Sequence, residues 1–103
     1  MSGKRRVVVT GLGVISPVGN NVPSAWAALL AGKSGVGPIT RFDASALHCR
    51  IAGEVKGFDV TSVMSAKEAR RLDTFIHYGV AAATEALRDC GLEVTDANRD
   101  RIG

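Results

Sequence analysis

The stretch VVVTGLGVISPVGN, residues 7–20, decides the fold of this chain, because an apolar run leads directly into Gly-x-Gly. The β-branched run Val7–Thr10 shows no polar alternation, which is typical of a strand buried on both faces of a parallel sheet. A Gly-x-Gly turn after such a strand also occurs in dinucleotide-binding loops. The stretch therefore admits two interpretations, a phosphate-binding loop and a turn that serves packing alone.

The phosphate-binding interpretation fails at several positions. The dinucleotide fingerprint is G-x-G-x-x-G at the start of a helix, with an acidic residue about 20 positions further on. Here Ser16 stands in place of the third glycine, Pro17 and Gly19 oppose a helix, and Gly32 and Lys33 occupy the region of the acid. We therefore expect a tight turn at the end of the strand, in which the glycines permit positive φ and close packing.

Length and composition indicate part of a larger core. The 103 residues predict one domain at most, with no internal boundary in residues 1–103. Apolar residues make up 46% of the chain, and there are 12 glycines in addition. A free domain of this size does not easily bury so much apolar surface, so we expect the segment to pack within a longer protein.

Charge and cysteine content exclude several classes of protein. The net charge of +3 arises because Lys4, Arg5 and Arg6 give +3, residues 67–71 give +2, and the remainder sums to −2. Such local clusters, with only 5% aromatic residues, do not predict a nucleic-acid partner. No apolar run reaches the roughly 18 residues of a membrane span. Two cysteines without a CxxC motif predict neither a zinc site nor a disulfide framework, and favour a cytoplasmic location.

The first half of the chain predicts one helix and one short strand. Asn21 is a good N-cap residue, and Gly32 is expected to end the helix that it starts. Residues 33–46 contain two glycines and a proline and are expected to form a loop. Residues 50–55 are expected to form a short strand.

The second half predicts two consecutive helices. The motif Ser65-Ala66-Lys67-Glu68 has the spacing of a capping box and predicts a short helix to about Leu72. Asp73 is expected to cap a longer helix that runs to about Cys90 and is closed by Gly91.

The longer helix is expected to lie between two layers, because it is apolar on two faces. One face, expected to be buried, contains Ile76, Gly79, Val80, Ala83, Leu87 and Cys90; the other contains Phe75, Ala82 and Ala86. Its many small residues predict close approach of a neighbouring backbone.

Five segments together resemble the N-terminal part of bacterial β-ketoacyl-acyl-carrier-protein synthase II, the elongating condensing enzymes of fatty-acid synthesis. They are RRVVVTGLGVISPVGN (5–20), AWAALLAGKSGVGPITRFD (25–43), IAGEV (51–55), RRLDTFIHYGVAAATEALRDCGL (70–92) and RIG (101–103). The resemblance covers almost the whole chain, and ketosynthase domains of polyketide systems share parts of it.

The resemblance implies an α/β fold of the thiolase type, of which this chain is the N-terminal part. That fold is a layered αβαβα arrangement with a mixed, mainly parallel sheet, usually in a homodimer. In the family, an acyl chain passes from carrier protein to a cysteine, malonyl carrier protein is decarboxylated, and the carbanion attacks the thioester. The family uses no metal and no organic cofactor.

The catalytic residues of the family are not expected within these 103 residues. The family's nucleophilic cysteine and two histidines lie in later motifs, which the surroundings of Cys49, Cys90, His48 and His77 do not match. Cys90 also ends a predicted helix, where the negative end of the helix dipole disfavours a thiolate. We expect both cysteines to be buried structural thiols, both histidines to be surface or core residues, and the chain alone to be inactive.

The one candidate binding site is a basic cluster, Lys67, Arg70 and Arg71. Their i, i+3, i+4 spacing places them on one face of a helix. An ordinary solvated helix surface would give the same pattern. The resemblance implies that these residues match the basic positions of a short helix that docks acyl carrier protein, an acidic partner bearing phosphopantetheine. Arg70 is the firmest of the three, because its planar fork suits a carboxylate. Asp43 is expected only to stabilise a turn.

Two functions remain open from the sequence. The chain is the N-terminal segment either of a condensing acyltransferase, in fatty-acid synthesis or in a polyketide ketosynthase domain, or of a non-catalytic ketosynthase-like partner of the chain-length-factor type. Residues 49–103 do not separate the two, because the cysteine that decides between them would follow later in a longer chain.

Overall fold

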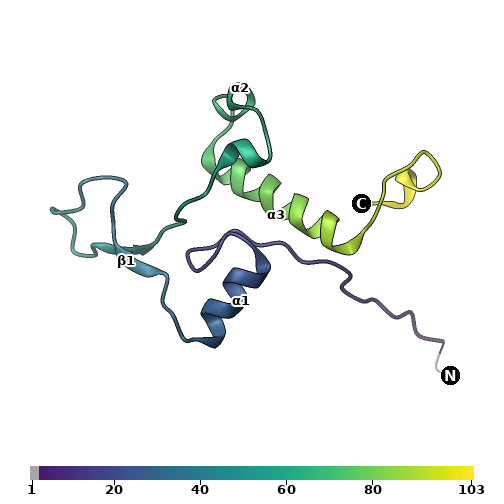
Figure 1. The fold of residues 1–103 in the computed structure, drawn as a ribbon, viewed down its shortest axis with the longest axis horizontal. Helices are drawn as coiled ribbons and strands as arrows, with labels where there is room; N and C mark the ends of the chain where they lie inside the picture. Colours follow the sequence, from purple (N-terminus) through teal and green to yellow (C-terminus); the bar gives the residue numbers. More distant parts are fainter. Residues whose placement is uncertain (1–2) are drawn as a thin grey trace.

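The structure, a computed structural model, describes residues 3–103. Helices and strands follow in the order α1 (Val22–Leu30), β1 (Val36–Pro38), β2 (Ile51–Gly53), η1 (Val60–Ser62), α2 (Ala66–Ala69), α3 (Thr74–Cys90) and η2 (Arg99–Arg101), where η is a 3-10 helix. The segment that precedes α1 passes between α1 and α3, and α2 stands at the N-terminal end of α3 (Figure 1). No helix among residues 3–103 is long and apolar enough to cross a membrane.

The predicted strand Val7–Thr10 is wrong for the described residues. The segment carries no strand hydrogen bonds, and Val7 and Val9 are 94% and 78% exposed. The only sheet within residues 3–103 is the antiparallel pair β1–β2, in which Val36 is opposite Gly53. β1 itself lies in the predicted loop 33–46. A strand exists only with a hydrogen-bonded neighbour, and residues 3–103 offer none to the N-terminal segment.

The glycine turn packs directly on α3. A Cβ atom at Gly11 would overlap the carbonyl oxygen of Ala86, and one at Gly13 would overlap the carbonyl oxygen of Ala82. The predicted close packing is therefore confirmed. The predicted positive φ is wrong, since neither glycine has it. Glycine is required at both positions because the backbone of the turn lies directly against the backbone of α3. The small side chains of the alanines in α3 also permit this close approach.

Two carboxylates on α3 bind the backbone of the N-terminal segment. Glu85 accepts hydrogen bonds from the backbone N–H of Val14 at 3.0 Å and of Val22 at 2.8 Å. Asp89 accepts one from the N–H of Leu12 at 3.0 Å. Val22 begins α1, where N–H groups lack partners within the helix and a negative charge is favourable. Glu85 thus joins the glycine turn, α1 and α3 at one point.

Replacing Glu85 by alanine is expected to lower the free energy of unfolding by about 2 kcal/mol, because two backbone N–H groups lose a charged acceptor. Urea denaturation measures this loss. Glu93→Ala is the matched control: Glu93 is exposed and its side chain makes none of the hydrogen bonds found in residues 3–103, so the cost should stay under about 0.5 kcal/mol. Equal costs for the two variants would contradict the role of Glu85.

The predicted helix ends are largely confirmed. Asn21 accepts the N–H of Ser24 at 2.9 Å, and the capping box of Ser65 and Glu68 is formed in both directions. Asp73 caps α3, and Gly91 ends it with a left-handed φ of 67°. Two boundaries differ from the prediction. The cap of α1 is Ala31, with left-handed Gly32 directly after it, and α2 ends at Ala69 rather than near Leu72.

The face of α3 that was expected to be buried is largely uncovered. Gly79, Val80, Ala83 and Leu87 are all exposed, and Leu87 retains 48% of its accessible surface. The covered side is the one that meets the glycine turn. The buried apolar residues within 3–103 are three alanines, Ala25, Ala44 and Ala81. The radius of gyration is 17.9 Å, against about 13 Å for a compact domain of this length. Most of the large apolar side chains are therefore exposed on the surface rather than buried in a core.

Candidate functional site

The basic cluster, Lys67, Arg70 and Arg71, lies on and directly after α2. All three residues are exposed. Arg70 is the C-cap of α2, with its N–H bonded to the carbonyl of Ala66, and the N–H of Arg71 is bonded to the carbonyl of Glu68. The helical turn thus continues past the last residue of α2, which keeps the three basic residues on one compact turn.

Within the cluster, the structure brings Lys67 and Arg71 together and sets Arg70 apart. Lys67 and Arg71 line a shallow hollow of about 260 Å³ with Ser65 and Glu68. Arg70 instead turns back along the helix, where its Nε donates to the carbonyl of Ala66 at 3.3 Å. One side of Arg70, which the sequence indicates as the firmest of the three docking residues, is therefore used within the chain.

The charge of the basic cluster is not neutralised within residues 3–103. The only ion pair found there joins Arg99 to Asp96 at 3.1 Å, and both side chains are exposed. Glu68, the acidic residue between Lys67 and Arg70 in the sequence, accepts the N–H of Ser65 at 3.3 Å in the capping box. The charges of the three cations are therefore not compensated by an ion pair within residues 3–103, although Nε of Arg70 is bonded to the carbonyl of Ala66.

Hydrogen bonds fix the segment before α2 and the C-terminal end of α2. In the preceding segment, Asp59 caps η1 and accepts hydrogen bonds from the Thr61 hydroxyl and from the Thr61 N–H, the latter at 3.0 Å, and these bonds lower the pKa of the Asp59 carboxyl. After it, Nε2 of His77 lies 2.9 Å from the carbonyl oxygen of Ala69. The sequence did not indicate this contact, because a lone histidine in an apolar helix carries no signal of its partner.

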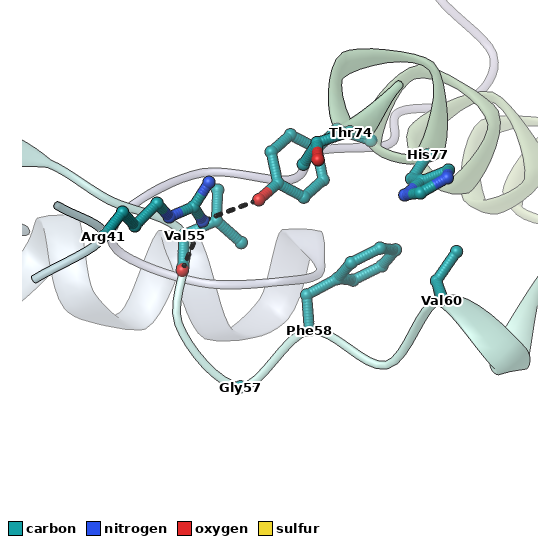
Figure 2. A pocket seen from close by; sticks show the side chains of 8 residues that line it. Arg41, Val55, Gly57, Phe58, Val60, Thr74 and His77 are labelled. Atoms are coloured by element: carbon teal, nitrogen blue, oxygen red, sulfur yellow. Dashed lines mark hydrogen bonds between the residues drawn. The ribbon is translucent and has the colours of Figure 1, made fainter. Parts of the chain in front are cut away.

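A second hollow, of about 380 Å³, lies between residues 55–60 and the start of α3 (Figure 2). Arg41 Nη2 donates to the Tyr78 hydroxyl at 2.8 Å and to the carbonyl of Val55 at 3.2 Å. The bond to Tyr78 raises the pKa of Arg41. Phe58 packs edge-on against Tyr78, with ring centroids 5.4 Å apart. These contacts tie the segments on both sides of β2 to α3, and Nη2 of Arg41 is directed at partners within the chain.

The cysteines show no catalytic arrangement among the described residues. Cys49 is exposed, so its prediction as a buried thiol is wrong. Cys90 is half-buried, and its sulfur contacts the backbone carbonyl of Leu87 and the N–H of Leu92. Within residues 3–103 no group of three or more His, Cys, Asp or Glu side chains could hold a metal ion.

Asp43 stabilises a turn, as predicted. Its carboxylate accepts the N–H of Ser45 at 3.0 Å, and this bond lowers the pKa of Asp43.

Comparison with known proteins identifies the family. Residues 4–103 match the family model described as "Beta-ketoacyl synthase, N-terminal domain". The chain is 58% identical to 3-oxoacyl-[acyl-carrier-protein] synthase 2 of Vibrio cholerae serotype O1, over 97% of this chain and 24% of the relative. It is 51% identical to the Synechocystis synthase 2, with the same coverage, and 44% identical to that of Staphylococcus aureus strain N315, over 100% and 25%.

A solved structure shares the fold. The protein titled "The ishigamide ketosynthase/chain length factor" superposes with a TM-score of 0.79 at 41% identity, over 88% of this chain and 23% of its own. The mixed helix and strand content thus corresponds to one part of a ketosynthase, a fold of the thiolase type. The chain spans about a quarter of the length of the curated relatives that it matches. The chain therefore belongs to the β-ketoacyl synthase family, and residues 4–103 match the model of its N-terminal domain.

Proposed function

We propose that this chain works as the N-terminal part of a β-ketoacyl-acyl-carrier-protein synthase of fatty-acid elongation. Such an enzyme transfers an acyl chain to malonyl carrier protein by decarboxylative Claisen condensation. The observation that carries the proposal is the 58% identity to a 3-oxoacyl-[acyl-carrier-protein] synthase 2 across 97% of this chain. The relatives are about four times longer, so the nucleophilic cysteine and the two histidines would lie in the remaining three quarters.

The first role of the segment in this proposal is structural. Residues 1–103 form one segment without an internal boundary. Val7–Val9 and the exposed face of α3 would be covered by the rest of a layered αβαβα fold. The valine run would gain its strand partners in the mainly parallel sheet of that fold, because a β-branched run without alternation suits a strand covered on both faces. The whole enzyme would be a homodimer in the cytoplasm.

The second role of the segment is docking of acyl carrier protein by Lys67, Arg70 and Arg71. Three facts support it: the cluster is exposed, it has no ion-pair partner within residues 3–103, and it sits on one turn. An acidic partner bearing phosphopantetheine complements that charge. Complementary charge raises the rate of encounter and fixes orientation more than it adds affinity. The cluster would therefore act on binding and leave the chemical step to residues elsewhere.

A chimera tests the proposed function. Residues 4–103 replace the corresponding residues of the Vibrio cholerae synthase, which supplies the remaining three quarters. We expect condensation of acyl and malonyl carrier proteins at a rate within about tenfold of the parent, a difference of ~1.4 kcal/mol in the barrier. The 103-residue chain alone should be inactive. A folded chimeric dimer that forms no 3-oxoacyl product would overturn the proposal.

A second candidate is a non-catalytic partner of the chain-length-factor type. It is favoured by one observation, the structural neighbour whose title names a ketosynthase together with a chain length factor. The protein sequence that follows residue 103 distinguishes the two candidates. A small residue followed by cysteine in a strand-to-helix turn, and two later histidine motifs, would support the condensing enzyme; their absence would support the partner.

A further inference from the structure

His77 is in hydrogen-bond contact with the helix that bears the basic cluster. It lies in the first turn of α3 and is half-buried, and its Nε2 is 2.9 Å from the carbonyl oxygen of Ala69, the last residue of α2. A carbonyl oxygen only accepts, so Nε2 carries the proton and donates it to this bond. On another side the ring lines the second hollow, with Phe58 and Val60 (Figure 2).

α2 needs such external support. It has only four residues, and a helix this short does not persist by its own hydrogen bonds. Its N-terminal end is closed by the capping box of Ser65 and Glu68. At its C-terminal end, the carbonyl of Ala69 accepts the N–H of Leu72 at 3.3 Å and the Nε2–H of His77 at 2.9 Å. The shorter of these two bonds comes from a side chain of the long helix α3.

The N-terminal part of α3 is held in place through Tyr78, the residue that follows His77. Tyr78 accepts a hydrogen bond from Arg41, which precedes β2, and packs against Phe58, which follows β2, so the N-terminal part of α3 is itself held by the segments on both sides of β2. His77 therefore links α2 to a fixed element. Arg70 and Arg71 follow Ala69 directly, and any displacement of the Ala69 carbonyl displaces their backbone as well.

We propose that His77 is a positioning residue for carrier-protein docking. By donating to Ala69 it fixes the end of α2 and thereby the direction in which Arg70 and Arg71 extend. The inference rests on the proposed docking function. A cluster ordered before binding loses less conformational entropy when the acidic partner arrives, and this lowers the cost of association. His77 itself touches neither the partner nor the reacting groups.

The test compares His77→Gln with His77→Asn in the chimera. The amide nitrogen of glutamine is as many bonds from Cα as Nε2 of histidine, whereas that of asparagine is one bond short. We expect His77→Asn to raise KM for carrier-bound substrate about three- to tenfold, which corresponds to one lost hydrogen bond, with kcat retained. His77→Gln should stay within about twofold of the parent. His48→Asn, at an exposed histidine between β1 and β2, is the matched control and should leave KM unchanged.

Two outcomes overturn the positioning role. One is an equal KM for His77→Gln and His77→Asn. The other is that His77→Asn lowers kcat/KM equally for carrier-bound substrate and for a small carrier-free acyl thioester. That result would show a general structural role. Arg71→Glu in the same assay separates this inference from the proposed function. If Arg71→Glu raises KM and His77→Asn does not, only the role of His77 fails; if neither raises KM, docking by the cluster fails and the role of His77 fails with it.

Discussion

Replacing Gly13 by alanine is expected to destabilise the fold by about 3 kcal/mol, the upper end of the cost of overpacking. A Cβ at this position would overlap the carbonyl oxygen of Ala82 and lie 2.9 Å from the backbone nitrogen of Ala86. Both neighbours are backbone atoms of α3, so no side chain can turn away to make room. The N-terminal segment would have to leave the helix, and the hydrogen bond from Val14 to Glu85 would be strained or lost.

Gly37→Ala provides the control for Gly13→Ala. Gly37 lies in β1 without positive φ, and a Cβ there would have no atom within 4 Å. Its cost should therefore stay under about 0.5 kcal/mol. Urea denaturation of the two variants in the chimera measures the difference. Comparable losses for Gly13→Ala and Gly37→Ala would show that the glycine turn does not need its close approach to α3.

Local features of this fold could be predicted from the sequence, because their causes lie within a few residues. The caps at Asn21 and Asp73 and the capping box of Ser65 and Glu68 satisfy backbone groups less than one turn away, and Gly91 ends α3 by its own left-handed conformation. Such signals do not depend on the rest of the protein. They placed the three helices and, with the resemblance, identified the family.

Features that depend on distant partners could not be predicted. A valine run indicates a strand only if another strand lies beside it, and residues 3–103 offer none to Val7–Val9. The bonds of Glu85 to the backbone of Val14 and Val22 span 71 and 63 residues, and backbone donors leave no pattern in a sequence. The contact of His77 with Ala69 was missed for the same reason. Docking by Lys67, Arg70 and Arg71 remains a prediction, since exposure alone does not identify a partner.

Reversing the charge of Arg70 and Arg71 to glutamate in the chimera is expected to raise KM for carrier-bound substrate about 10- to 100-fold. Attraction of the acidic carrier protein would be reduced, which slows encounter and misorients the complex. The salt dependence of association should weaken, because fewer opposite charges steer the approach. Arg5→Glu with Arg6→Glu is the matched control. It changes the net charge equally at two adjacent exposed residues and should leave KM nearly unchanged.

The most direct test of carrier-protein docking by this chain is a ratio of two efficiencies in that Arg70 and Arg71 variant. The first is kcat/KM for acyl groups on carrier protein, and the second is kcat/KM for the same acyl groups on a small carrier-free thioester. If the basic cluster docks the carrier protein, the ratio falls at least about tenfold, because only the first substrate presents acidic surface to the cluster. If both efficiencies fall equally while the fold is intact, or if neither falls, the cluster is an ordinary solvated surface and the docking account is wrong.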